Sequence, residues 1–182
     1  MSIRRQLVTV LAAATVAVVS AQPQAAGAAG CAHADAAPHT ATRAAIASAV
    51  GCAINGERTR HGLAPLTVDE SLASAALAHS RDMVRRHYFR HITRGDGPAE
   101  RAMRAGYLDG ANRWLIGETL AWGWGPGASA HRIVESWMRS PEHRRVLLRP
   151  DYRELGVGVI WGGPHPRAQP DATFTANFGV IG

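Results

Sequence analysis

The sequence contains no lysine: all 20 of its basic side chains are arginines, against 14 acidic side chains. We interpret this first as the coding bias of a GC-rich genome. The alternative is that clustered arginines attract anionic wall polymers or lipid head groups. The clusters are Arg85, Arg86, Arg90 and Arg94, and then Arg144, Arg145 and Arg149. No RNA- or DNA-binding motif accompanies them, so nucleic acid is not expected as a partner.

Beyond its N-terminus, the sequence also lacks an apolar run long enough to cross a membrane. Residues 1–30 are typical of a secretory signal peptide, because Arg4 and Arg5 precede an apolar run at 7–19 and a stretch of small residues. We therefore expect the mature protein to be secreted, extracellular and monomeric, with no transmembrane segment.

Cysteine is scarce, since only Cys31 and Cys52 are present. In an oxidising compartment an even pair indicates a disulfide rather than a metal site. The bridge would tie a polar linker arm, residues 31–42, to the first helix and stabilise the fold by about 3 kcal/mol. The alternative is that Cys31 follows a lipoprotein cleavage site and is acylated, which leaves Cys52 as a free thiol.

The common catalytic signatures are missing as well. The sequence has no His-Glu-x-x-His segment and no Gly-x-Ser-x-Gly turn. If the two cysteines form a disulfide, neither thiol is available as a catalytic nucleophile. We therefore assign no catalytic residue from the sequence.

Residues 43–182 suffice for one domain with a hydrophobic core but not for two. Helical patterns come first and strand patterns last, which indicates an α+β sandwich. The expected helices are 42–60, a helix from a capping box at 67–70 to about Arg86, and 98–105. The expected strands are 155–161, whose glycines suit close packing on one side, and 172–180, with a hairpin-like loop at 162–170.

Residues 135–143 contain the break around which the expected site is arranged. A helix with Trp137 on its apolar face ends before Ser140, which is placed to N-cap a second helix opened by Pro141. His143 then falls in the first turn of that second helix.

Two further residues complete the candidate cleft. His91 follows Tyr88 at the end of an earlier helical segment, and Glu118 lies inside an apolar stretch. A buried carboxylate is costly unless it is paired, so Glu118 is either a site residue or a structural glutamate bonded to backbone or to a helix N-terminus. Two histidines and a carboxylate are the smallest set of side chains that we expect for a metal-binding or catalytic site. By contrast, we interpret His79 as a core histidine that bonds nearby backbone.

A series of short motifs, taken in their order along the chain, resembles the CAP superfamily, the SCP-like extracellular domain, in its short bacterial secreted form. The motifs run from Ile54 to Val180. They are Asn55-Gly56-Glu57-Arg58, Gly62-Leu63-Ala64-Pro65-Leu66, His79-Ser80-Arg81-Asp82-Met83, Tyr88-Phe89-Arg90-His91, Ala105-Gly106-Tyr107, Gly117-Glu118-Thr119-Leu120-Ala121, Trp137-Met138-Arg139-Ser140-Pro141-Glu142-His143, Leu155-Gly156-Val157-Gly158 and Asn177-Phe178-Gly179.

The resemblance implies an α-β-α sandwich with a central, mainly antiparallel sheet and a cleft that in many members holds two His and two Glu, and in some a divalent metal. His91, His143 and Glu118 match three of these positions. The second glutamate would fall near Ser140, where this chain has none, and Thr119 replaces the commoner asparagine. Both departures count against a four-ligand metal site.

Two functions remain open. We favour an extracellular binding module for a lipid, sterol, cell-wall polymer or protein partner, with tryptophans lining an apolar groove unless they belong to the core. These tryptophans are Trp114, Trp122, Trp124 and Trp161. The alternative is a metal-assisted hydrolase, a peptidase or cell-wall hydrolase, in which His91, Glu118 and His143 hold a divalent cation such as zinc.

Overall fold

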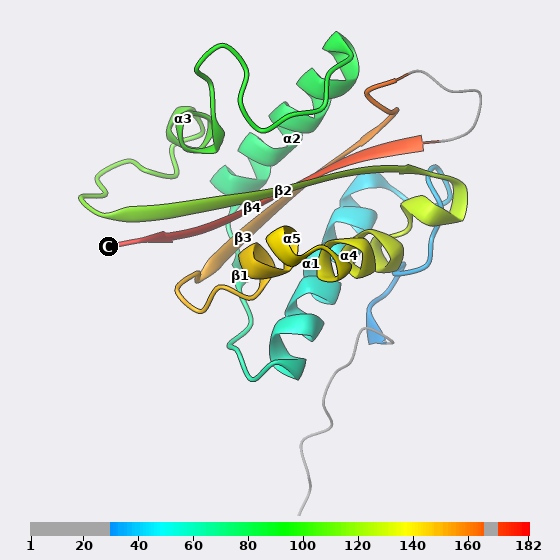
Figure 1. The fold of residues 1–182 in the computed structure, drawn as a ribbon, viewed down its shortest axis with the longest axis horizontal. Helices are drawn as coiled ribbons and strands as arrows, with labels where there is room; N and C mark the ends of the chain where they lie inside the picture. The colour runs from blue at the N-terminus through cyan, green and yellow to red at the C-terminus, as the bar shows by residue number, and fades with distance from the viewer. Residues whose placement is uncertain (1–29, 166–170) are drawn as a thin grey trace, which may run out of the picture.

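The computed structural model describes residues 30–165 and 171–182 (Figure 1). The signal peptide expected at 1–30 therefore lies almost wholly outside the described residues, as does part of the loop expected at 162–170. The helices are α1 (Arg43–Arg60), α2 (Glu70–Arg86), α3 (Pro98–Arg104), α4 (Ala130–Arg139) and α5 (Pro141–Leu147). The strands are β1 (Thr67–Val68), β2 (Trp114–Trp124), β3 (Glu154–Trp161) and β4 (Asp171–Ile181).

The four strands form one sheet in the order β1-β3-β4-β2. β3 and β2 both pair antiparallel with β4, while the short β1 runs parallel to β3. α1, α4 and α5 cover one face of the sheet, and α2 and α3 cover the other (Figure 1). This is an α-β-α sandwich with a mainly antiparallel sheet, and it confirms the predicted fold class.

The two faces of β3 differ because its residues alternate in size. Gly156 and Gly158 face α2, where a Cβ atom on either would clash with the helix backbone at Ala73 or Leu77. α2 therefore lies directly on the glycine side of the strand, as the alternation predicts. The opposite face carries Leu155 into the main core with residues of α1, α4 and β4.

Two local expectations need correction. The helix expected from the capping box at 67–70 starts later, because the Thr67 N–H donates to the Arg153 carbonyl (3.0 Å) and makes residues 67 and 68 a strand. Asp69 caps α2 instead, accepting from the Leu72 N–H (2.8 Å). Ser140 does stand at the N-cap of α5, but its side chain makes no capping hydrogen bond.

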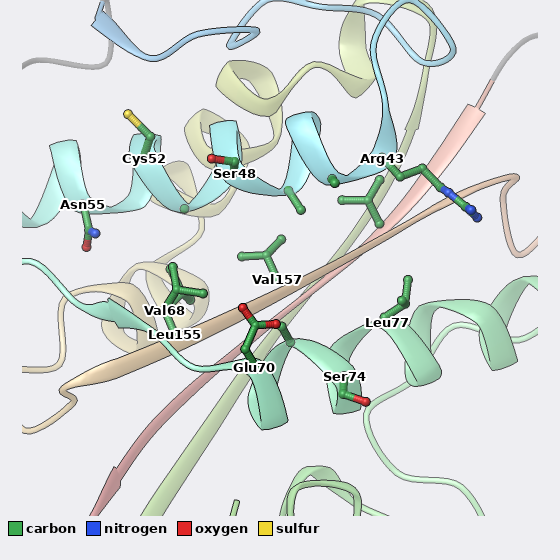
Figure 2. A pocket seen from close by; sticks show the side chains of 15 residues that line it. Arg43, Ser48, Cys52, Asn55, Val68, Glu70, Ser74, Leu77, Leu155 and Val157 are labelled. Carbon is green, nitrogen blue, oxygen red and sulfur yellow. The ribbon is translucent and has the colours of Figure 1, made fainter. Parts of the chain in front are cut away.

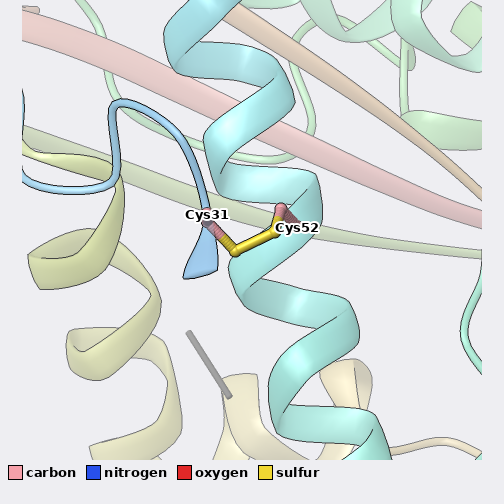
Figure 3. The surroundings of a disulfide bond; sticks show 2 residues. All are labelled: Cys31 and Cys52. Atoms are coloured by element: carbon pink, nitrogen blue, oxygen red, sulfur yellow. A yellow bond between two sulfur atoms is a disulfide. The ribbon is translucent and has the colours of Figure 1, made fainter. Parts of the chain in front are cut away.

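The linker arm is held against the domain at several points. Cys31 and Cys52 form the predicted disulfide, which joins the arm to the middle of α1 (Figure 3). The Ala34 carbonyl accepts from the His131 N–H on α4 (2.9 Å), and the His39 ring packs on Trp161. The bridge therefore fixes the arm beside α1 and α4.

None of the helices in the described part of the chain is both long and apolar enough to cross a membrane.

Candidate functional site

Glu118 lies at the centre of a polar cluster on the α2 and α3 side of the sheet. It stands in β2, opposite Asn177 of β4, and its side chain is only 1% exposed. Because Glu118 is in a strand, the alternative that it sits at a helix N-terminus is wrong. Its carboxylate needs partners at this depth.

Two side-chain N–H donors meet this carboxylate. The His91 Nδ1–H donates to Oε1 (2.8 Å), and the Arg101 guanidinium donates to Oε2 (2.8 Å). The Asn177 amide, turned so that its nitrogen faces the carboxylate, adds a third donor to Oε2 (3.1 Å). We call these residues, with His79, the Glu118 cluster.

Arg101 is the most heavily engaged member of the Glu118 cluster. It lies on α3 with its side chain 4% exposed, so its ion pair with Glu118 is shielded from water. Its guanidinium also donates to the carbonyls of His91 (2.9 Å) and Asp96 (3.0 Å). Arg101 therefore both neutralises Glu118 and holds the 87–97 loop against the sheet.

His91 is in this loop rather than at the end of a helix as expected, because α2 stops at Arg86 and His87 adopts a left-handed conformation (φ 56°). The His91 side chain is 48% exposed, so one ring edge reaches Glu118 and the ring remains accessible to solvent. A carboxylate that orients an exposed imidazole is one half of a general-base arrangement. No serine or cysteine among the described residues hydrogen-bonds this ring.

His79 joins the same cluster from α2. It is buried, and its Nε2 donates to the Arg90 carbonyl (3.2 Å), which confirms the predicted backbone bond. Nε2 also lies 3.9 Å from Glu118 Oε1. Burial lowers the pKa of His79, and this outweighs the opposing effect of the Glu118 charge.

His143 and Ser140 make no hydrogen bond to the Glu118 cluster among the residues that the structure describes. Burial lowers the pKa of His143, with a further lowering from His91, so the two imidazoles are near enough to interact. Neither side chain hydrogen-bonds to Glu118 or to His91 in the described structure. The structure therefore brings His91 and Glu118 into contact and leaves Ser140 and His143 outside that contact.

The three residues proposed as metal ligands are not gathered around a common ion position within the described residues. Both oxygens of Glu118 already accept hydrogen bonds, so its carboxylate is placed to orient His91 rather than to bind an ion itself. Within residues 30–165 and 171–182, no group of three or more His, Cys, Asp and Glu side chains is arranged to hold an ion. The guanidinium of Arg101 provides the positive charge that a metal would otherwise supply.

Sequence reasoning missed Arg101 and Asn177. The available signal was the carboxylate in an apolar stretch, which demands a donor. That signal does not identify which of the 20 arginines pairs with the carboxylate. Only the packing of α3 on β2 selects Arg101.

A polar hollow of about 400 Å³ adjoins the cluster, lined by residues of α2 and α3 with His79 and Arg101. Arg85 and Arg86 of the first arginine cluster line it, but Arg90 and Arg94 do not. Arg85 is paired with Asp82 (2.9 Å). Attraction of anionic polymers to this surface stays a prediction.

A second, apolar cavity lies at the opposite side of β3 from β4. Its volume is about 770 Å³, and α1 and α2 form its walls while one edge of β3 forms its floor (Figure 2). We call it the α1–α2 groove. Its lining residues are Arg43, Ala44, Ala47, Ser48, Gly51, Cys52, Asn55, Val68, Glu70, Ala73, Ser74, Leu77, Leu155, Val157 and Val159.

Small and apolar side chains dominate this groove, and Arg43 and Glu70 are the only charged residues among the described ones that line it. None of the four tryptophans considered for an apolar groove is among these lining residues. Trp161 instead packs against the main core, and Trp114 and Trp124 are exposed. The groove was not predicted, because it arises where two consecutive helices flank a strand that is distant from them in sequence.

Comparisons with known proteins agree with this fold. Residues 52–178 match the model of the CAP, cysteine-rich secretory protein family. The chain is 38% identical over 102 residues to the uncharacterized membrane protein YlbC of Bacillus subtilis, covering 56% of this chain and 28% of that protein. The chain thus spans well under half of that relative's length.

Two solved structures share the architecture. An outer surface protein of Borrelia burgdorferi superposes with a TM-score of 0.65 at 22% identity, covering 80% of this chain and 99% of that one. An extracellular protein of Bacillus anthracis containing an SCP domain gives a TM-score of 0.57 at 25% identity, over 76% of this chain and 43% of that one. The family match over most of the folded residues, together with the α-β-α sandwich, shows that this chain belongs to the CAP, or cysteine-rich secretory protein, family.

Proposed function

We propose that the protein is an extracellular binding module without catalytic activity, and that the α1–α2 groove holds its ligand. The observation that carries this proposal is the groove itself, an apolar cavity of about 770 Å³. Ligand sites in proteins are typically concave, mainly apolar and of roughly 300 to 1,000 Å³, with a few polar groups that set orientation. Arg43 and Glu70 provide those groups here.

The state of the Glu118 cluster supports the same conclusion. Its carboxylate is buried and saturated by donors, so it is poorly placed to activate water or to bind a ligand. We interpret the cluster as a structural element that positions the 87–97 loop. The ligand classes that suit the groove are those with an extended apolar part: a lipid, a wall component or a segment of a protein partner.

Blocking the groove tests this function. The variant Ser48→Trp places an indole at an exposed lining position of α1, and Ser136→Trp makes the same change at an exposed position of α4 outside the groove. Binding of dodecanoate, a sterol and cell-wall fragments would be measured by calorimetry. We expect any ligand bound by the wild type to lose at least tenfold in affinity in Ser48→Trp and to be unaffected in Ser136→Trp. Equal binding by all three proteins would contradict the proposal.

The metal-assisted hydrolase is the second candidate, and one observation favours it: an exposed imidazole, His91, is oriented by a buried carboxylate. Zinc titration at pH 7.5 and pH 5.5 tests it. If a shared site exists, the wild type binds zinc weakly at pH 7.5 and more weakly at pH 5.5, because histidine takes up a proton near pH 6.5. His91→Ala, Glu118→Gln and His143→Ala would each weaken binding. No binding at either pH, or equal binding by all variants, rules the site out.

A further inference from the structure

We propose that the ligand of the α1–α2 groove is an extended peptide, which adds as a parallel strand to the free edge of β3 and places its C-terminal carboxylate at Arg43. This inference rests on the proposed binding function and narrows it to one class of ligand. Three features of the groove support it: the hydrogen-bonding direction of β3, the size of the lining side chains, and the position of the two charges.

The first feature is an unpaired edge of β3. The Gly162 N–H donates to the Asp171 carbonyl of β4 (2.9 Å), and alternate residues of an antiparallel strand share one hydrogen-bonding direction. The backbone N–H and C=O groups of the odd-numbered residues of β3 are directed away from β4. The Leu155 carbonyl, for example, accepts from the Asp69 N–H on the opposite side (3.0 Å). The backbone groups of Val157 and Val159 therefore point to the groove side of β3, where Val157 is half-buried and Val159 is 1% exposed.

Nothing in the described part of the chain pairs with that edge beyond Leu155. β1 is the only described strand on this side, and its register ends where Val68 meets Leu155. A row of backbone N–H and C=O groups without strand partners is a template for another strand. An extended peptide satisfies those groups at the spacing of the sheet, whereas an alkyl chain offers them neither donor nor acceptor.

The second feature is room on both sides of the edge. α1 presents Ala44, Ala47 and Ser48 to the groove, and α2 presents Ala73 and Ser74. Side chains of an added strand alternate between its two faces, so each face meets a helix wall of small residues. Aliphatic peptide side chains of moderate size suit these walls.

The third feature fixes the direction of the peptide. Val68 ends β1 at one end of the groove, Glu70 follows it closely, and Arg43 lies toward the other end (Figure 2). A peptide in line with β1, and so parallel to β3, has its amino group near Glu70 and its carboxylate near Arg43. The reverse direction would place like charges together. At about 3.3 Å per residue, the edge takes roughly four or five residues.

The test uses a five-residue peptide of alternating valine and alanine with free termini, titrated into isotopically labelled protein. We expect binding to slow amide hydrogen exchange at Val157 and Val159 at least tenfold. A C-terminal amide on the peptide should weaken binding about tenfold. Arg43→Ala should remove the difference between the two peptides, while Arg81→Ala, an exposed arginine of α2 outside the groove, should preserve it.

The failures of this test are distinguishable. If dodecanoate binds in the groove and the peptide does not, the binding function stands and the peptide proposal is wrong. Peptide binding without slowed exchange at Val157 and Val159 overturns strand addition, and equal binding of the amide overturns the assigned direction. If neither probe shifts any resonance of the groove residues, the peptide proposal and the proposed function both fail.

Discussion

The Glu118 cluster and the α1–α2 groove lie in the same domain but are built in opposite ways. The cluster is a set of polar side chains that satisfy one another, and its carboxylate is 1% exposed. The groove is apolar and open, and the unpaired groups at its floor belong to the backbone. If the proposed function is right, a conspicuous set of His and Glu residues is structural here, and the binding surface lies where no sequence motif indicates it.

The largest expected effect comes from breaking the cluster. Arg101→Ala removes the partner of a buried carboxylate, and we expect unfolding free energy to fall by about 3 to 5 kcal/mol. Arg81→Ala, at an exposed position of α2, should cost less than about 0.5 kcal/mol. Chemical denaturation measures both. A loss below about 1 kcal/mol for Arg101→Ala would show that Glu118 does not depend on this guanidinium.

The next effect concerns the wall of the groove. The disulfide joins residues 21 apart and attaches the linker arm to α1, which forms one groove wall. Replacing both cysteines by serine should lower the unfolding free energy by about 3 kcal/mol through the freed loop entropy of the unfolded chain. Denaturation of the double variant, with wild type under oxidising conditions as reference, checks this. Intact mass should show two thiols only after reduction, and a lipid mass on Cys31 would contradict the bridge.

The smallest effect is a pH dependence of stability to which the cluster contributes through His79. Burial lowers the pKa of His79, so the unfolded chain takes up its proton at higher pH than the folded protein does. The effect of His79 on the unfolding free energy is absent above about pH 6.5. Below that value His79 destabilises the folded protein increasingly as the pH falls. A tenfold difference in proton affinity corresponds to about 1.4 kcal/mol. His79→Gln should therefore lose less stability than wild type between pH 7 and pH 5 in denaturant titrations, and parallel curves would exclude the mechanism.

Much of the fold follows from local pattern. The helical spacing of apolar residues located α1 and α2 within a few residues, and the alternation of glycine with large residues located β3 and its close contact with a helix. The extent of β2 was not predicted, since glycines interrupt it and its residues are stabilised by pairing with β4 along its whole length. Pairing with a distant strand also turned residues 67 and 68 from a helix start into β1.

The sequence alone determined the positions of most helices and of the last two strands, the even pair of cysteines, the family motifs and the need of Glu118 for a partner. Each depends on local spacing or on the cost of burying a charge, and both can be read from residue types. The tertiary structure decided that Arg101 is that partner, that His143 lies outside the contact, and that a groove opens beside β3. These depend on which surfaces meet across the sheet, and local pattern does not specify that.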